Sequence, residues 1–116
     1  MREPTQGTFG LVVRFELLDG REEAFDELTA TTLQAIRASE PGTLANFVHR
    51  DGSNPSVRVF YELYENEAAF ETHENQPHVR RFLNERRHHL RTEPEVWPVV
   101  PMDGVLRQES DIIGGR

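Results

Sequence analysis

The spacing of apolar residues along this chain alternates between two periods, in an order that few folds accommodate. Apolar residues two apart indicate a strand, and apolar residues three or four apart indicate one face of a helix. The order is strand, helix, strand, strand, helix, strand, which is the ferredoxin-like arrangement of an α+β protein. The four predicted strands cover residues 9–18, 44–50, 57–64 and 95–100.

The first predicted helix follows the first strand and runs to about Ser39. Asp19 and Glu22 have the D-x-x-E spacing of a capping box, which indicates where the helix begins. Pro41 and Gly42 then stop it. Its buried stripe is predicted from residues spaced three or four apart, namely Phe25, Leu28, Thr32 and Ile36.

The second half of the chain is predicted to contain a hairpin, a broken helix and an edge strand. The hairpin loop, residues 51–56, is longer than a two-residue turn. Asn66 caps a short helix, and Pro77 suits the first turn of a helical stretch that continues to about Arg91. Pro98 favours an edge position for the last strand.

Length places the chain among single-domain proteins. A chain of 116 residues buries one core, and we assign residues 1–101 to the domain and residues 102–116 to a tail. The tail segment VLRQESDII is compatible with a short element packed on a partner and equally with disorder.

Charge and composition exclude several classes of function. With 20 acidic and 13 basic residues the net charge is −7, which disfavours nucleic acids and anionic membranes as partners. The absence of cysteine excludes disulfides, thiolate metal sites and a cysteine nucleophile. Neither a signal peptide nor a long apolar run is visible, so we expect a soluble, cytoplasmic protein.

The predicted strands are apolar on both faces, although the helices of this fold cover only one. Val12 lies opposite the main apolar face of the first strand, and Tyr61 lies opposite Phe60 and Tyr64 in the third. A solitary sheet would leave a polar open face, so this pattern predicts a second cover. A second copy of the chain is the simplest one, and we expect a homodimer.

Polar residues inside apolar stripes are the candidates for chemistry. His73 shares a helix face with Ala69 and Phe70, where it is either a core-edge histidine or a base in an apolar pocket. Arg86 falls within the stripe of the second helical stretch. It either extends to the surface along its methylenes or holds an anion.

The remaining candidates are weaker. Glu62, in the third strand, is predicted to lie near Arg14 of the neighbouring first strand, as an ion pair or as a carboxylate that orients a substrate. His49 and Asn46 occupy opposite faces of the second strand, so at most one of them shares a given pocket. His78 is expected at a surface or pocket mouth.

The histidine spacing does not match a helical metal site, and no nucleotide-binding motif is present, so neither metal nor cofactor is predicted.

Two strings, SEPGTLANFVHRD and VFYELYENEAAFETHENQPHVRRF, resemble the antibiotic biosynthesis monooxygenase domain family. The family pattern runs from E-P-G at the first helix end, through F-Y-E-x-Y in a strand, to A-x-F-x-x-H and a later histidine. It is met by Glu40-Pro41-Gly42, by residues 60–64, by Ala68, Phe70 and His73, and by His78 and Phe82. The likeness covers roughly residues 8–100 and implies a dimeric α+β barrel.

The resemblance implies oxidation of a quinol, hydroquinone or anthrone-like aromatic by dioxygen without a cofactor, the substrate supplying the electrons. A base removes a phenolic or enolic proton, a cation or donor stabilises the anion, and an apolar pocket holds the substrate. The catalytic residues implied are His73, Arg86 and Glu62, and the substrate-binding residues are Tyr64, His78, His49 and Phe82.

Two alternatives remain open within this likeness, whereas a third, the haem-degrading branch, is disfavoured. The haem-degrading branch expects an asparagine in the first strand and a mid-chain tryptophan, whereas residues 9–18 lack asparagine and Trp97 lies in the last strand. A cofactor-free isomerase of a small carbonyl compound would use the same base without oxygen. A non-catalytic ligand-binding accessory protein of a biosynthetic pathway would bind without turnover.

Overall fold

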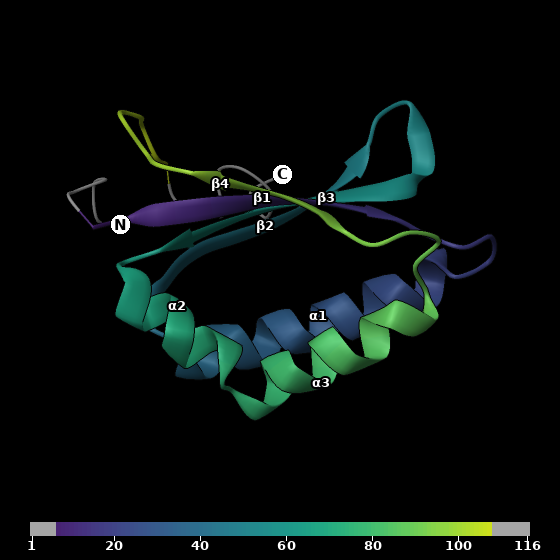
Figure 1. Ribbon diagram of the computed structural model, residues 1–116, viewed down its shortest axis with the longest axis horizontal. Helices are drawn as coiled ribbons and strands as arrows, with labels where there is room; N and C mark the ends of the chain where they lie inside the picture. Colours follow the sequence, from purple (N-terminus) through teal and green to yellow (C-terminus); the bar gives the residue numbers. More distant parts are fainter. Residues whose placement is uncertain (1–6, 108–116) are drawn as a thin grey trace.

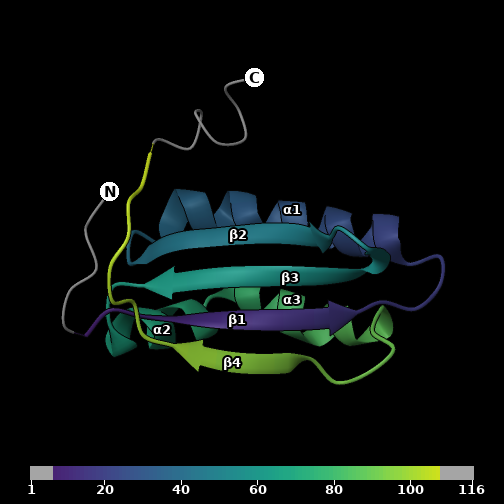
Figure 2. The same ribbon diagram turned by 90° about the horizontal axis from the view of Figure 1, so that it is seen from above.

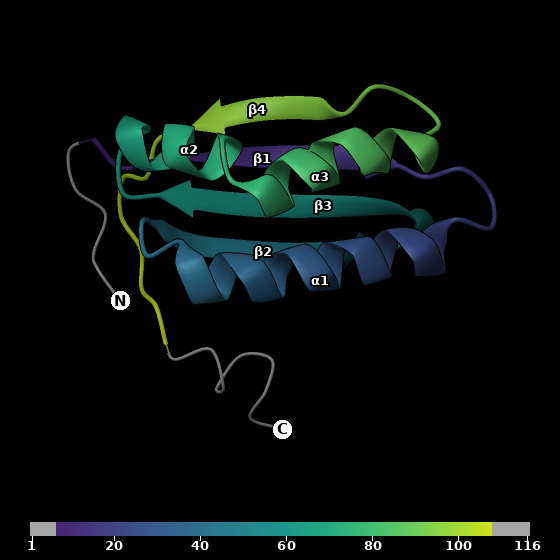
Figure 3. The ribbon, with the colours of Figure 1, turned by 90° about the horizontal axis from the view of Figure 1, so that it is seen from below.

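The computed structural model describes residues 7–107 as a four-stranded antiparallel sheet covered on one face by helices (Figure 1). The strand order is β2-β3-β1-β4 (Figure 2), and viewed from below the three helices lie over one face of the sheet, roughly along the strands (Figure 3). The ferredoxin-like α+β prediction is confirmed. The elements are β1 (Phe9–Glu16), α1 (Glu22–Ser39), β2 (Thr43–Asp51), β3 (Asn54–Tyr64), α2 (Glu67–Glu74), α3 (Pro77–Glu85), a 3-10 turn (Arg86–His88) and β4 (Glu95–Val99).

The core forms where the alternating face of β1 meets the helices. Phe15 is buried and packs edge-on against Phe60 of β3, with ring centroids 4.6 Å apart. Phe25 of α1 and Phe82 of α3 close the cluster from the helical side. The predicted stripe of α1 is confirmed, since Phe25, Leu28, Thr32 and Ile36 are all buried.

The predicted capping box at the start of α1 is wrong. The N-cap is Arg21, and no side chain caps this helix among the described residues. The chain turns at Gly20, whose φ of +79° favours glycine, so Asp19 lies too far upstream to reach the helix. Asp19 instead accepts a hydrogen bond from Arg91.

The hairpin loop is shorter than predicted, because both strands continue into it. Asp51 pairs with Asn54, which leaves Gly52 and Ser53 as a two-residue turn. The Asp51 carboxylate accepts from the Ser53 amide at 2.8 Å and stabilises this turn. Pro55 is tolerated in β3 because β3 extends there beyond the end of its pairing with β1.

The second helical segment matches its predicted start but not its predicted end. Asn66 caps α2 by accepting from the Ala69 amide at 2.8 Å, and Pro77 opens α3. The α-helix ends at Glu85 rather than near Arg91. The reason is that the chain must return to the sheet, where the Arg91 amide donates to the Glu16 carbonyl.

The uncovered face of the sheet carries an apolar row that crosses all four strands. Phe47, Tyr61, Val12 and Trp97 are successive register partners from β2 to β4. Trp97 is 49 % exposed. The tail element suggested for residues 105–113 lies mostly outside the described residues, and residues 105–107 form no regular structure.

Candidate functional site

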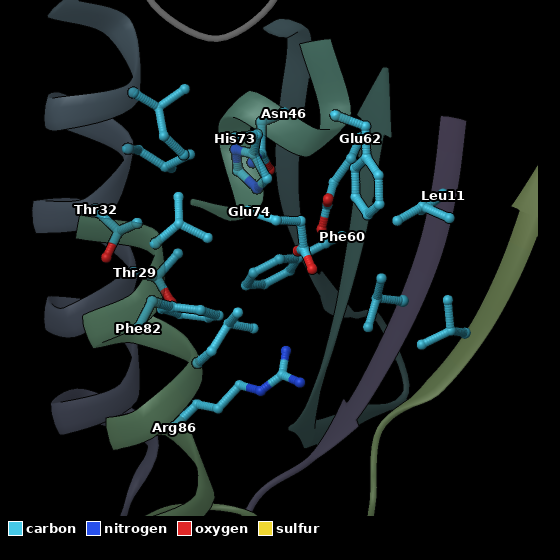
Figure 4. A pocket seen from close by; sticks show the side chains of 17 residues that line it. Leu11, Thr29, Thr32, Asn46, Phe60, Glu62, His73, Glu74, Phe82 and Arg86 are labelled. Atoms are coloured by element: carbon cyan, nitrogen blue, oxygen red, sulfur yellow. The ribbon is translucent and has the colours of Figure 1, made fainter. Parts of the chain in front are cut away.

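A cavity of about 250 Å³ lies between the helices and the covered face of the sheet (Figure 4). Its wall is mainly apolar, and its polar residues come from α1, β2, β3, α2 and the 3-10 turn. Those polar residues are Thr29, Thr32, Asn46, Glu62, His73, Glu74 and Arg86. The remaining lining is aliphatic and aromatic, including Phe60 and Phe82.

His73 lines this cavity from α2, as the helical spacing predicted. Its side chain is 8 % exposed, and its ring packs on Tyr64 with centroids 5.1 Å apart. The sequence had indicated apolar surroundings for His73, but the structure also places a polar group beside it. The Nδ1 atom lies 2.6 Å from Oε1 of Glu40, so this histidine has a carboxylate partner.

Glu40 is the polar residue that the sequence analysis missed as part of the site. It is the C-cap of α1, its side chain is 2 % exposed, and it forms hydrogen bonds with three side chains. His73 and Thr43 bond to Oε1, and Nε2 of His78 bonds to Oε2 at 2.5 Å. Burial alone would raise the pKa of Glu40, but the hydrogen bonds from His73, His78 and Thr43 outweigh it and hold that pKa below its ordinary value.

Glu62 also lines the cavity, but its partner is not the one predicted. The β1–β3 register places Leu11 opposite Glu62 and Val59 opposite Arg14. Arg14 therefore points away from Glu62 and contacts other carboxylates. The hydroxyl of the fully buried Tyr64 donates to Glu62 at 2.5 Å. Burial raises the pKa of Glu62 despite this bond.

Arg86 reaches the cavity from the 3-10 turn after α3. Its guanidinium carbon lies 5.5 Å from the ring centroid of Phe15 and 6.0 Å from that of Phe82. Burial lowers its pKa, and among residues 7–107 it has no ion-pair partner. Figure 4 shows Arg86 and Glu62 extending toward the cavity from opposite sides. A cation without a partner beside an apolar cavity can bind an anionic oxygen.

The structure decides between Asn46 and His49 in favour of Asn46. Asn46 faces the cavity, and its Oδ1 atom is buried without a hydrogen-bond partner among the described residues. His49 lies on the other face of β2, is exposed, and contacts the Val59 carbonyl at 3.1 Å. The predicted place of His49 in the site is therefore corrected. An unpaired buried amide oxygen needs a donor, which a ligand hydroxyl would supply.

The predicted residues thus fall into three groups, the third of which is His49 alone, outside the cavity. His73, Glu62, Arg86 and Phe82 line one cavity. Tyr64 lies one hydrogen bond away from it, through Glu62, and His78 lies two away, through Glu40 and His73. Among residues 7–107 no cluster of three or more histidine, aspartate or glutamate side chains is arranged to hold a metal, and no helix is long and apolar enough to cross a membrane.

The fold and the cavity together define a ferredoxin-like domain in which His73, Glu62 and Arg86 line one cavity between the sheet and the helices. Residues 8–85, more than half of the chain, match the family model described as antibiotic biosynthesis monooxygenase. The chain therefore belongs to the antibiotic biosynthesis monooxygenase family. No curated protein matches it.

Solved structures of similar fold are numerous but distant in sequence. A candidate antibiotic biosynthesis monooxygenase from Caulobacter crescentus is 18 % identical, with a TM-score of 0.80 over 84 % of this chain and 92 % of its own. One from Bacteroides thetaiotaomicron is 18 % identical, with a TM-score of 0.81 over 89 % and 98 %. A Mycobacterium tuberculosis protein is 18 % identical, with a TM-score of 0.78 over 85 % and 99 %.

Proposed function

We propose that this protein is a cofactor-independent monooxygenase that oxidises a quinol-type aromatic with dioxygen. The observation that carries the proposal is the arrangement of His73 and Arg86 on one apolar cavity, a base and an unpaired cation. Deprotonation of a phenol needs both, because the proton must be accepted and the resulting anion stabilised. Membership of the family supports the same chemistry.

The reaction needs no electron source other than the substrate. His73 removes a phenolic proton, and the electron-rich anion passes an electron to dioxygen, after which the two radicals combine at a ring carbon. One oxygen atom remains in a hydroxyquinone product, and the other leaves as water with two hydrogens from the quinol. The apolar wall keeps water from the reacting centre.

The size of the cavity narrows the choice of substrate. A cavity of roughly 150 Å³ holds benzene, and this one measures about 250 Å³. One ring or two fused rings fit this volume better than the three rings of an anthrone. A hydroxyl on such a ring would also supply the donor that Asn46 Oδ1 lacks.

An oxygen electrode with a panel of one-ring and two-ring hydroquinones tests this function. We expect oxygen uptake above autoxidation, with one oxygen atom of labelled dioxygen in the product by mass spectrometry. Isomer formation without oxygen uptake would instead identify a cofactor-free isomerase. Binding without turnover would identify an accessory protein, and either result would refute the proposal.

The purified protein is expected to carry no chromophore and no stoichiometric metal. The reasons are the missing nucleotide-binding motifs, the absence of cysteine and the unsuitable histidine spacing. Absorption spectra and elemental analysis provide the measurement. A flavin or haem band, or one metal per chain, would contradict this prediction.

We further propose that the protein is a homodimer through the uncovered faces of its sheets. The apolar row that includes Val12 and Trp97 would otherwise remain in water. A Val12→Lys variant places a charge in the middle of this row, so we expect it to shift the mass in light scattering from dimer to monomer. Ala30→Lys adds the same charge on the exposed side of α1 and should leave the dimer intact. A wild-type monomer at micromolar concentration would contradict the proposal.

A further inference from the structure

We propose that Glu40 is a positioning residue, which fixes His73 as the tautomer protonated on Nδ1 and thereby leaves the lone pair of Nε2 facing the cavity. Its importance for turnover rests on the proposed function. The tautomer itself does not, because it follows from contacts that exist without substrate.

The first step concerns the charge of Glu40. The Thr43 hydroxyl donates to Oε1, Nδ1 of His73 lies 2.6 Å from the same oxygen, and Nε2 of His78 lies 2.5 Å from Oε2. Hydrogen bonds with these three groups outweigh burial and hold the pKa of Glu40 below its ordinary value, so its ionised form is favoured. Glu40 is therefore a carboxylate under ordinary conditions, and a carboxylate can only accept hydrogen bonds.

The second step locates the proton on His73. A separation of 2.6 Å between Nδ1 and Oε1 is a charge-assisted hydrogen bond, which requires a proton between the two atoms. Because Glu40 cannot donate, the proton belongs to Nδ1. In the neutral form of this imidazole, Nε2 then carries the lone pair.

The third step concerns the direction of that lone pair. The ring of His73 packs on Tyr64 and stacks on Phe70, with centroids 5.1 Å and 6.4 Å apart, which limits its rotation. With Nδ1 held by Glu40, Nε2 is the nitrogen without a partner among the described residues. His73 also projects into the upper end of the cavity in Figure 4. Nε2 can therefore accept a proton from a bound phenol.

His78 supports this arrangement from the other side of the carboxylate. Asn75 and Gln76 separate α2 from α3, and this break brings His78 to Oε2 while His73 binds Oε1. With both oxygens bonded, the Glu40 side chain cannot swing away from His73. When His73 gains a substrate proton, the adjacent carboxylate also balances the new positive charge.

Nuclear magnetic resonance of the wild-type protein labelled with nitrogen-15 tests the tautomer directly. Long-range proton–nitrogen spectra distinguish a protonated imidazole nitrogen from one with a lone pair. We expect protonated Nδ1 and unprotonated Nε2 for His73, and protonated Nε2 for His78. A neutral His73 protonated on Nε2 would overturn the inference, whether or not any quinol is a substrate.

The Glu40→Gln variant then tests the role in turnover. An amide offers one acceptor oxygen and one donor nitrogen, so it cannot accept from both histidines. We expect at least one of the two rings to switch its protonated nitrogen, and kcat to fall by at least about 10-fold with KM little changed. Glu71→Gln makes the same change at an exposed position of α2, so it should retain both tautomers and the wild-type kcat.

A folded Glu40→Gln protein with wild-type kcat and unchanged tautomers would refute the positioning role, even if the wild type oxidises quinols. If Glu40→Gln does not fold, as dispersion of its amide spectrum would show, Glu40→Asp replaces it. Aspartate keeps the charge on a shorter side chain that cannot bridge both rings. A wild-type kcat in Glu40→Asp together with the loss of the His73 Nδ1 proton would then overturn the role.

Discussion

Replacing His73 with alanine is expected to lower kcat on a quinol substrate by about 10²- to 10⁴-fold, the usual share of general-base catalysis. In the proposed mechanism Nε2 of His73 accepts the phenolic proton, since Nδ1 is bonded to Glu40, so the substitution removes that acceptor. Steady-state oxygen uptake at saturating substrate measures the effect. His88→Ala removes an exposed histidine of the 3-10 turn and should retain full activity.

The same His73→Ala variant should remain folded, which separates its catalytic effect from an effect on stability. It leaves one oxygen of Glu40 with one donor fewer, at a cost of about 1–3 kcal/mol. Phe82→Ala, which opens a hole in the aromatic core, should cost about 3–5 kcal/mol. Urea unfolding of both variants provides the comparison.

Full activity in His73→Ala would mean that another group removes the proton. Glu62 is then the next candidate, because it lines the same cavity. Burial raises the pKa of Glu62, which makes its carboxylate a stronger base. His49, which the sequence had placed in the site, is not a candidate because it lies outside the cavity.

The spacing of apolar residues was sufficient to predict the fold, because burying one face of a helix or strand fixes that spacing directly. The α1 stripe that ends at Ile36 and the alternating face of β1 could be assigned from spacing, and the structure buries both. Local turns were harder to predict, since they depend on individual hydrogen bonds. The Asp51–Ser53 bond and the positive φ of Gly20 shortened one loop and displaced one helix cap.

The site was predicted only in part, for a reason of the same kind. His73 and Arg86 interrupt apolar stripes, so the sequence marks them as unusual. Glu40 does not stand out in this way, because it lies at a helix end, where polar residues are usually exposed. Its burial arises only when α2 and α3 pack over that helix end and bring His73 to it.

A second difficulty was to predict which face of the sheet each strand residue occupies. Which of Asn46 and His49 faces the helices depends on the register of β2, and that register shifts at a bulge between Thr43 and Ala45. The prediction that Arg14 lies near Glu62 was wrong for a similar reason. Adjacent strands were predicted correctly, but the register that separates the two residues is fixed by pairing along the whole of β1 and β3.

Replacing Arg86 with methionine is expected to lower kcat by about 10²- to 10³-fold, the usual effect of removing one donor that stabilises a developing oxyanion. The methionine keeps an unbranched side chain over Phe15 and Phe82, so packing on the two rings changes little. Arg86→Lys retains the charge but not the planar fork, and we expect its kcat to lie between those of methionine and wild type.

The stability of Arg86→Met distinguishes a functional arginine from a structural one. Burial lowers the pKa of Arg86, which means that the folded protein disfavours its charge relative to the unfolded chain. Removing the charge should therefore leave the free energy of unfolding unchanged or raise it, while activity falls. Arg87→Met, at the exposed neighbouring position, should change neither quantity. A large loss of stability in Arg86→Met with kcat preserved would show that this arginine holds the fold rather than the substrate anion.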